Sequence, residues 1–265
     1  MSFKDLGLSD KTIQAIDEFG MNTPTTLQND VIPSILEGKD VFAIAPRGSG
    51  KTISYVFPLI DIISNKKGQN ILIITPSSHH SVRVSDSLAI FNKYHEINEA
   101  TIKNGDEDIN NEANVIIGSP DLLLEMSDKV DFSHTNILVV DDINLIKSNK
   151  QLDNLEKILA LLPADKQNIV FTNRRSKETQ DILDKILQAP AEIKIDKDKE
   201  LEAENIANSE ASANRRQPKE REKSKPHQFA QASIDEEAMD LIKKYDTFNG
   251  QVPEFLKYKG IVVSE

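Results

Sequence analysis

Short apolar runs alternate with helical patterns from Asp40 to about Ile195. In several of these runs the apolar residues are consecutive instead of alternating, which indicates strands that are buried on both faces of a parallel sheet. The predicted strands are Asp40–Ala45, Asn70–Thr75, Asn114–Gly118, Asn136–Asp141, Asn168–Thr172 and Ala191–Ile195, with a weaker one over Glu99–Lys103.

Helical periodicity occupies the stretches between these strands. Over Asn149–Leu162 one face carries Leu152, Leu155, Ile158, Leu159 and Leu162, as expected of a helix that packs on a sheet. Two further helices are predicted ahead of the first strand, over Ser9–Phe19, with Ser9 as the N-cap, and over Thr26–Leu36. Strand and helix in alternation predict a doubly wound α/β domain over residues 1–196, with a mostly parallel sheet between helices.

The composition changes after Asp196. Residues 197–232 include almost no large apolar side chain, and their charge shifts from acidic to basic. Such a segment cannot bury enough surface to offset the entropy of ordering, so we predict a disordered charged linker. Residues 233–265 are predicted to form a short amphipathic helix, Ser233–Tyr245, and an extended docking tail. This helix either packs on the α/β domain or binds a partner protein.

The charge of the chain limits its contacts with nucleic acid. The 265 residues have a formal net charge of -11, and the isoelectric point is near 5.0. An acidic surface repels a phosphate backbone at long range, so any contact with nucleic acid has to be local. The clustered basic stretch Arg215–Lys225 is the candidate RNA-binding arm, and the interspersed Glu220 and Glu222 weaken it.

Cysteine content and the N-terminal segment restrict the compartment. The chain has no cysteine, which excludes a disulfide framework and thiolate metal sites. The first residues, MSFKDLGLSDK, lack the apolar core of a signal peptide. No apolar run approaches the roughly 20 residues that cross a bilayer. We therefore expect a soluble, cytoplasmic protein without membrane contacts.

The segment Ala45–Thr52, APRGSGKT, joins the first predicted strand to a helix. At such a turn several backbone N–H groups point to one place, and glycines let phosphate oxygens approach them. Lys51 is expected to reach the β- and γ-phosphates of a nucleotide, and the Thr52 hydroxyl to bind magnesium. A tight turn with an incidental lysine is the alternative, but the adjacent Lys-Thr pair disfavours it. The predicted nucleotide-binding residues of the loop are Arg47, Gly48, Ser49, Gly50, Lys51 and Thr52.

The segment of residues 3–28 precedes this loop and carries a second signal. Phe3, then Gly20, then the run PTTLQ that ends at Gln28 match the adenine-recognition segment of DEAD-box RNA helicases. The chain therefore resembles the first RecA-like lobe of that family, from Phe3 to about Ile195. The resemblance implies ATP as the ligand, with Gln28 at the adenine edge and Phe3 packed beside the base. A carboxamide is donor and acceptor at once and can pair with adenine N6 and N7.

The family's Asp-Glu-Ala-Asp motif is replaced here by DDIN, residues 141–144. By resemblance, Asp141 keeps the magnesium position, reached through water. Asp142 stands where the family has the glutamate that orients and deprotonates the attacking water. Its carboxylate ends one methylene short, and a displacement of about 1 Å can cost ~10²-fold in rate. Asn144 lacks the charge with which the last aspartate of the motif ties neighbouring segments together.

The family's RNA-contact and coupling motifs are degraded. Pro-Thr-Arg-Glu-Leu is replaced by PSSHH, residues 76–80, and Thr-Pro-Gly-Arg by SPDL, residues 119–122. The glycine pair is reduced to Asn104-Gly105, and Ser-Ala-Thr is replaced by TNR, residues 172–174. The pair His79-His80 could indicate a metal site, but adjacent residues diverge, and a solvated loop is the favoured interpretation.

The second RecA-like lobe of the family supplies an arginine finger, worth roughly 10³–10⁵ in rate. We expect no such lobe after Ile195, where a low-complexity tail follows. The chain is therefore predicted to be an ATP-binding accessory or regulatory factor with weak or no autonomous ATPase. One alternative is a genuine RNA-remodelling ATPase that a partner chain completes. Another is a decayed remnant with no nucleotide role.

Overall fold

The computed structural model describes residues 1–66, 68–103 and 113–195. Within them a sheet of seven parallel strands runs in the order β3-β4-β2-β5-β6-β1-β7. The strands are β1 (Val41–Ile44), β2 (Ile71–Ile74), β3 (Glu99–Thr101), β4 (Val115–Gly118), β5 (Ile137–Val140), β6 (Gln167–Thr172) and β7 (Ala191–Lys194). The predicted α/β class, with a mostly parallel sheet, is confirmed. The Asn104-Gly105 pair, the linker, the basic arm Arg215–Lys225 and the helix Ser233–Tyr245 lie outside the described residues.

All seven predicted strands are present, and most are shorter than predicted by one or two residues at an end. At the amino edge of the sheet, polar residues leave the ladder and bond across it through side chains. The Asn70 amide donates to Asn136 Oδ1 at 2.8 Å, and the Asn168 amide donates to Asp40 Oδ1 at 2.7 Å. Asp40, Asn70 and Asn136 therefore close the ends of β1, β2 and β5 instead of extending them, while Asn168 is part of β6.

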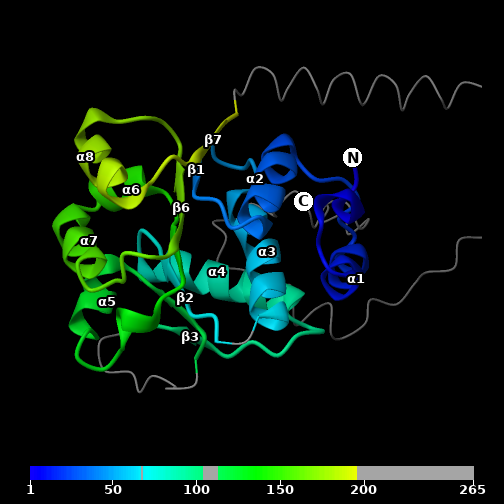
Figure 1. The fold of residues 1–265 in the computed structure, drawn as a ribbon, viewed down its shortest axis with the longest axis horizontal. Helices are drawn as coiled ribbons and strands as arrows, with labels where there is room; N and C mark the ends of the chain where they lie inside the picture. Colours follow the sequence, from blue (N-terminus) through cyan, green and yellow to red (C-terminus); the bar gives the residue numbers. More distant parts are fainter. Residues whose placement is uncertain (67, 104–112, 196–265) are drawn as a thin grey trace, which may run out of the picture. The chain divides into compact units, whose positions relative to one another are not determined.

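Helices cover both faces of the sheet (Figure 1). On one face the helices are α1 (Asp10–Phe19), α2 (Thr26–Leu36), α3 (Lys51–Asn65) and α4 (Ser78–Phe91), and on the other α5 (Pro120–Glu125), α6 (Ile143–Ser148), α7 (Leu152–Leu159) and α8 (Lys177–Ile186). Two short 3₁₀ helices, η1 (Phe3–Leu6) and η2 (Phe132–His134), complete the described elements.

The strand residues alternate between two apolar cores. Val139 of β5 belongs to the core under α1 to α4, and its neighbours Leu138 and Val140 belong to the core under α5 to α8. All four residues of β5 are buried. Consecutive apolar runs arise because both side-chain rows of each inner strand meet helices, which is the reason that the pattern predicted a parallel sheet.

The predicted helices agree with the structure except in one length. Ser9 is the N-cap of α1, where its side chain accepts a hydrogen bond from the Thr12 amide, and α2 covers Thr26–Leu36 as predicted. The helix predicted over Asn149–Leu162 is wrong at both ends, because α7 spans only Leu152–Leu159. Lys150 has a φ of 60°, in the left-handed region, so the chain turns between α6 and α7 before the second helix begins.

A buried carboxylate joins α1 to α3. Asp61 of α3 is 2% exposed and accepts hydrogen bonds from the Ser9 amide at 2.6 Å, the Ser9 hydroxyl at 2.6 Å and the Thr12 hydroxyl at 2.5 Å. Because a buried carboxylate needs such partners, this contact fixes the N-terminal segment against the helix that follows the phosphate loop. Among the described residues no helix is long and apolar enough to cross a bilayer.

Candidate nucleotide-binding site

The predicted site residues gather at the carboxyl edge of the sheet. Ala45 directly follows β1, Asp141 directly follows β5, and Thr172 ends β6; these three strands are neighbours in the order β5-β6-β1. The Ala45 amide donates to the Thr172 carbonyl at 2.9 Å, so the ends of β1 and β6 are in register. Parallel strands place their carboxyl ends at one edge, and this is where α/β proteins bind ligands.

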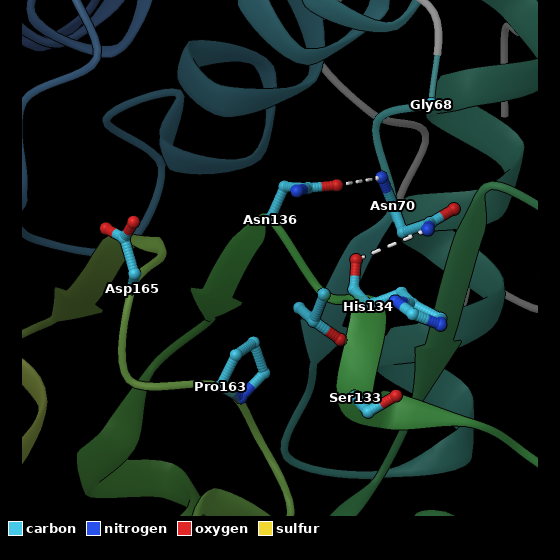
Figure 2. A pocket seen from close by; sticks show the side chains of 8 residues that line it. Gly68, Asn70, Ser133, His134, Asn136, Pro163 and Asp165 are labelled. Carbon is cyan, nitrogen blue, oxygen red and sulfur yellow. Dashed lines mark hydrogen bonds between the residues drawn. The ribbon is translucent and has the colours of Figure 1, made fainter.

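A separate pocket lies at the opposite, amino edge (Figure 2). Asn70 and Asn136, which precede β2 and β5, face one another there, and Asn70 Nδ2 also donates to the His134 carbonyl at 3.2 Å. The side chain of Asp165 lies apart from this group. The asparagines satisfy one another within the loops, and none of the predicted site residues lines the pocket.

The phosphate loop turns sharply between β1 and α3. Gly48 and Gly50 have φ values of 86° and 84°, in the region that favours glycine, and Gly50 is the N-cap of α3. No side chain caps this helix end. The first turn of α3 therefore presents backbone N–H groups and the positive end of the helix dipole, which together suit a phosphate.

Lys51 lies over its own loop. Its Nζ donates to the Ala45 carbonyl at 3.0 Å and to the Pro46 carbonyl at 2.8 Å. Partial burial lowers the pKa of the Lys51 ammonium, while the nearby carboxylates of Asp142 and Asp141 raise it. The cation is thus placed between the loop and the two aspartates. Contact with a phosphate would replace its two carbonyl partners.

The adenine-recognition segment contacts the phosphate loop directly. The Thr25 hydroxyl donates to the Ser49 carbonyl at 3.0 Å, and Gln28 Oε1 accepts from the Thr25 amide at 2.9 Å, which caps α2. Gln28 is 2% exposed. A Cβ added at Gly50 would lie 2.6 Å from Gln28 Nε2. Gln28 therefore packs against the glycine turn, and the two predicted halves of the site are one unit.

Phe3, at the start of this segment, lies in the apolar core under α1 to α4. It lies in η1, is 3% exposed, and packs edge-on against Phe57 of α3 with ring centroids 5.6 Å apart. The structure thus places Phe3 in the apolar core, against α3. Contact of its ring with a base stays a prediction.

Asp141 is held in a buried position at the end of β5. It is 8% exposed, and its Oδ2 accepts a hydrogen bond of 3.0 Å from the Tyr55 hydroxyl. Burial raises the pKa of Asp141 to about 6, and the hydrogen bond from Tyr55 opposes this rise. Burial likewise raises the pKa of Tyr55, and a hydrogen bond with Thr52 acts on the pKa of the same hydroxyl in the opposite direction. Thr52, Tyr55 and Asp141 are therefore neighbours.

These donors fit a magnesium ion that is bound mainly by phosphate and water. Magnesium in nucleotide sites takes one or two protein oxygens and keeps several waters. The described residues contain no cluster of three histidine or carboxylate groups that would form an all-protein metal cage. The Thr52 hydroxyl and the Asp141 carboxylate are hard oxygen donors of the required kind. They would hold a magnesium ion whose role is to neutralise phosphate charge.

Asp142 is buried and adopts an unusual backbone conformation. It is 7% exposed, has a φ of 59°, and serves as the N-cap of α6, where its Oδ1 accepts from the Leu145 amide at 3.2 Å. One carboxylate oxygen is thereby engaged by the helix end. The residue at the predicted base position thus has a structural use, and its shorter side chain reaches less far than a glutamate would.

Asn144 ties two segments together without a charge, so the loss of charge predicted from the sequence does not untie them. Its Nδ2 donates to Thr172 Oγ1 at 2.8 Å and to the Arg174 carbonyl at 2.6 Å. Thr172 Oγ1 also donates to the Arg174 carbonyl at 2.9 Å. An amide donor suits a carbonyl acceptor, which an ionised carboxylate would repel. The turns after β5 and β6 are therefore joined by neutral hydrogen bonds.

At the predicted RNA-contact positions the polar side chains bond within their own turns, and the Pro76 carbonyl accepts from Asn149 Nδ2 at 2.7 Å. Ser77 Oγ and His80 Nδ1 are 2.8 Å apart, and the Ser119 hydroxyl donates to Asp121. The prediction that His79-His80 forms a solvated loop is wrong, because both residues lie in the first turn of α4. Their rings meet at a centroid distance of 5.9 Å, and burial lowers the pKa of His80.

Comparison with known protein families shows to which family this chain belongs. The sequence model described as DEAD/DEAH box helicase matches residues 25–182, more than half of the chain. The chain belongs to this family. Its fold is accordingly the RecA-like lobe of a DEAD-box helicase, and residues 25–182 include both the phosphate loop and the segment after β5.

Curated relatives match the same portion of this DEAD-box chain. It is 28% identical over 202 residues to the DEAD-box ATP-dependent RNA helicase RhpA of Helicobacter pylori, covering 73% of this chain and 41% of that protein. It is 26% identical over 212 residues to the ATP-dependent RNA helicase DeaD of Haemophilus influenzae, covering 74% and 33%. The chain therefore spans less than half the length of these helicases.

Solved DEAD-box structures share the fold. A DEAD box protein from Methanococcus jannaschii matches with a TM-score of 0.69 and 26% identity, over 74% of this chain and 56% of that one. Dbp5 of Saccharomyces cerevisiae, in a structure with Gle1 and IP6, matches with a TM-score of 0.67 and 20% identity, over 74% and 52%. The second likeness is one of fold alone.

Two residues of the DEAD-box site escaped the sequence-based prediction. The Thr25 hydroxyl links the adenine-recognition segment to the loop, and the Tyr55 hydroxyl contacts Asp141. A signal for Tyr55 exists in the sequence, since it lies four residues after Lys51 and three after Thr52, on the same face of a helix. Its partner is 86 residues away and could not be read from that spacing.

Proposed function

We propose that this DEAD-box lobe binds ATP with magnesium and acts as an accessory or regulatory factor in cytoplasmic RNA metabolism, with weak or no autonomous ATPase. The observation that carries the proposal is the union of the adenine-recognition segment with the phosphate loop, through Thr25, Ser49 and Gln28 against Gly50. The residues proposed to contact the nucleotide lie together at this edge, while the positions of the family's RNA-contact motifs, 76–80 and 119–122, have no lysine or arginine.

In the proposed complex each part of the site has one task. The N–H groups of the glycine turn and the Lys51 ammonium bind the phosphates. Gln28 pairs with the adenine edge. To do so, its Oε1 must either break its hydrogen bond with the Thr25 amide or accept from the Thr25 amide and the adenine at once. Thr52 and Asp141 hold magnesium, directly or through water.

The side chain of Asp142 is the proposed reason for slow hydrolysis. Its carboxylate is shorter than the glutamate of the family's motif, and one oxygen already caps α6. A base must lie within hydrogen-bonding distance of the attacking water. We therefore expect turnover to be limited at the step in which this water is oriented, and not at nucleotide binding.

A second candidate function is an RNA-remodelling ATPase that a separate chain completes. The link from Asn144 to the turn after β6 favours it, because the segments that follow β5 and β6 can still move as a unit. In that case the partner would supply the groups that stabilise the transition state, and turnover would depend on the concentration of the partner.

The decisive experiment is equilibrium binding of ATP and ADP, with and without magnesium, alongside steady-state hydrolysis with and without RNA. Lys51→Ala should weaken ATP binding by about 10- to 100-fold, because it removes a charged hydrogen-bond donor to the phosphates. Lys185→Ala, which removes a surface lysine paired with Glu156 at 2.9 Å, is the matched control and should bind normally.

The outcomes separate the three hypotheses. Binding with negligible turnover, raised by Asp142→Glu, supports the accessory function. Strong RNA-stimulated turnover by the chain alone contradicts it and supports an active remodelling enzyme. ATP at about 100 times its Kd should raise the free energy of unfolding by about 2.7 kcal/mol. If millimolar ATP does not raise the melting temperature, the remaining hypothesis is a decayed remnant with no nucleotide role.

RNA and protein contacts are proposed for the C-terminal region. The basic arm Arg215–Lys225 would bind RNA weakly through its phosphates, and the tail of residues 233–265 would bind a protein partner. Replacing Arg215 and Arg216 by alanine should reduce the slope of log affinity against log salt by about one unit for each arginine that binds a phosphate. An unchanged slope would place the RNA-binding residues elsewhere.

A further inference from the structure

The Tyr55 hydroxyl is a buried polar group that is not among the residues predicted to bind the nucleotide or the metal. Tyr55 is fully buried in α3, and its ring packs on Phe171 of β6 with centroids 5.4 Å apart and planes 50° apart. The residues that follow it in α3, from Val56 to Ile60, are apolar and buried. A buried hydroxyl in such surroundings costs free energy unless it finds a partner.

That partner is a residue of the predicted metal site. The hydroxyl donates to Asp141 Oδ2 at 3.0 Å, from an element 86 residues away in the sequence. Thr52, the other predicted magnesium residue, lies beside the same hydroxyl. One side chain thus connects the helix that begins at the phosphate loop to the strand end that carries the acidic residue.

We propose that Tyr55 is a positioning residue of the magnesium site, which fixes the Asp141 carboxylate relative to Thr52 before the nucleotide arrives. The inference rests on the proposed ATP-binding function and deepens it. Because Oδ2 is held by the hydroxyl, Oδ1 is the oxygen that is left for the metal and its waters. Lys51, Thr52 and Tyr55 belong to one rigid helix, so the hydrogen bond sets the distance between the phosphate loop and β5.

Tyr55 can position Asp141 because both residues are held rigidly. The ring of Tyr55 is fixed by close packing, and Asp141 follows a strand that is paired on both sides by β2 and β6. A group that orients a metal-binding carboxylate typically changes metal affinity by about 10- to 100-fold when it is removed. Removal of the Tyr55 hydroxyl should therefore weaken ATP binding in the presence of magnesium. ATP binding without metal should not change.

Tyr55→Phe is the appropriate variant, since it removes the hydroxyl and keeps the ring contact with Phe171. ATP affinity is measured by calorimetry on the full chain, once with magnesium and once with a chelator. We expect the ratio of the two affinities to fall by about tenfold or more in Tyr55→Phe, with the metal-free affinity unchanged. The control is Tyr94→Phe, which removes a hydroxyl bonded to Glu18 at the surface and should leave the ratio unchanged.

A double-mutant cycle with Asp141→Asn tests whether Tyr55 acts through Asp141. In the Asp141→Asn background, Tyr55→Phe should have no further effect on the magnesium dependence. The inference is overturned if Tyr55→Phe keeps the wild-type ratio, if it weakens binding equally with and without metal, or if its effect persists without Asp141. A wild type that binds no ATP in either condition refutes the proposed function itself, which is a different result.

A measurement on the wild type covers the case in which Tyr55→Phe does not fold. The hydroxyl proton of Tyr55 is buried and hydrogen-bonded, so it should exchange slowly enough to give its own proton NMR signal. This signal should shift when magnesium is added to the ATP complex and should not shift when ATP is added with a chelator. A signal that ignores magnesium would overturn the inference.

Discussion

The proposed nucleotide side of this lobe, which comprises the phosphate loop with Thr25, Gln28, Tyr55 and Asp141, uses polar side chains differently from its RNA side, the positions 76–80 and 119–122 of the family's RNA-contact motifs. On the nucleotide side the hydrogen bonds connect distant elements, such as Thr25 to Ser49 and Tyr55 to Asp141, which are 24 and 86 residues apart. On the RNA side the side chains at these positions bond within one turn, as for Ser77 with His80, three residues apart, and Ser119 with Asp121, two apart. The long-range bond there is made by a backbone group, since the Pro76 carbonyl accepts from Asn149 Nδ2 at 2.7 Å.

The difference shows which site the fold maintains. Long-range hydrogen bonds between buried groups require both partners to be retained, because a lone partner is left unsatisfied. Local hydrogen bonds only stabilise a turn, and many residue types can do this. On the nucleotide side, side chains of distant elements therefore hold one another in place, while the side chains of Ser77, His80, Ser119 and Asp121 bond only to close neighbours in the sequence.

The strongest test of the nucleotide side is Asp141→Asn in the absence of magnesium. The pKa of Asp141 in the folded protein is about 6, above the ordinary value of 3.8. The folded state therefore binds more protons than the unfolded state between about pH 4 and pH 6, and the free energy of unfolding falls as pH rises through that window. The isosteric amide should remove this slope and stabilise the protein at pH 7 by up to about 3 kcal/mol.

Urea unfolding at pH 4.5 and pH 7 measures this effect, together with ATP binding at pH 7. Asp141→Asn should gain stability and lose magnesium-dependent binding, which is the expected exchange of stability for function at a metal site. A variant that is less stable than the wild type at pH 7 would show that Asp141 is satisfied by contacts beyond Tyr55.

Gly50→Ala tests the junction between the adenine-recognition segment and the phosphate loop. The alanine is strained at a φ of 84°, and its Cβ would displace Gln28 from the cap of α2. The strain and the loss of the cap together should cost about 2 to 3 kcal/mol of unfolding free energy. Gly48→Ala is a matched control, because its φ is 86° but nothing lies within 4 Å of the added Cβ.

The difference between the two glycine variants isolates the contact with Gln28. We expect Gly48→Ala to cost about 1 kcal/mol less than Gly50→Ala in urea unfolding. Equal losses of stability would mean that Gln28 moves aside freely and that the junction is looser than its hydrogen bonds indicate.

Asn144 tests the link between the turns after β5 and β6. Asn144→Ala leaves the buried Thr172 hydroxyl and the Arg174 carbonyl short of a donor and should cost about 1 to 2 kcal/mol. Asn144→Asp restores the residue of the family's motif, yet it should also destabilise at pH 7, because its carboxylate faces a carbonyl oxygen. Urea unfolding of both variants measures these losses. If the link instead depended on a negative charge at position 144, Asn144→Asp would be neutral or stabilising.

The smallest expected effect concerns the RNA side. Ser78→Arg restores a basic residue at the start of α4, at the position of the arginine in the family's first RNA-contact motif. RNA affinity at low salt should rise by a few-fold, and the dependence of log affinity on log salt should steepen by about one unit. Ser87→Arg, on a later turn of the same helix, adds the same charge as a control. If Ser78→Arg and Ser87→Arg raised RNA affinity equally, the gain would be a non-specific effect of charge, and position 78 would not be an RNA-contact position.

Much of the site could be predicted from the sequence because its parts are local. The glycine turn, Lys51 and Thr52 lie within one strand–turn–helix unit, whose chemistry depends on adjacent residues. The parallel sheet was predictable for a similar reason, since burial on both faces removes the polar positions from a strand. The helix over Asn149–Leu162 was not, because the left-handed turn at Lys150 leaves no mark in apolar spacing.

The sequence by itself determined the phosphate loop, the parallel α/β sheet and the membership of the DEAD-box family. Only the tertiary structure decided which polar groups are partners: Thr25 with Ser49, Tyr55 with Asp141, and Asn144 with the turn after β6. The physical reason is that backbone conformation and burial depend on nearby residues. A hydrogen bond between separate elements instead depends on how the helices and strands pack, which no single segment encodes.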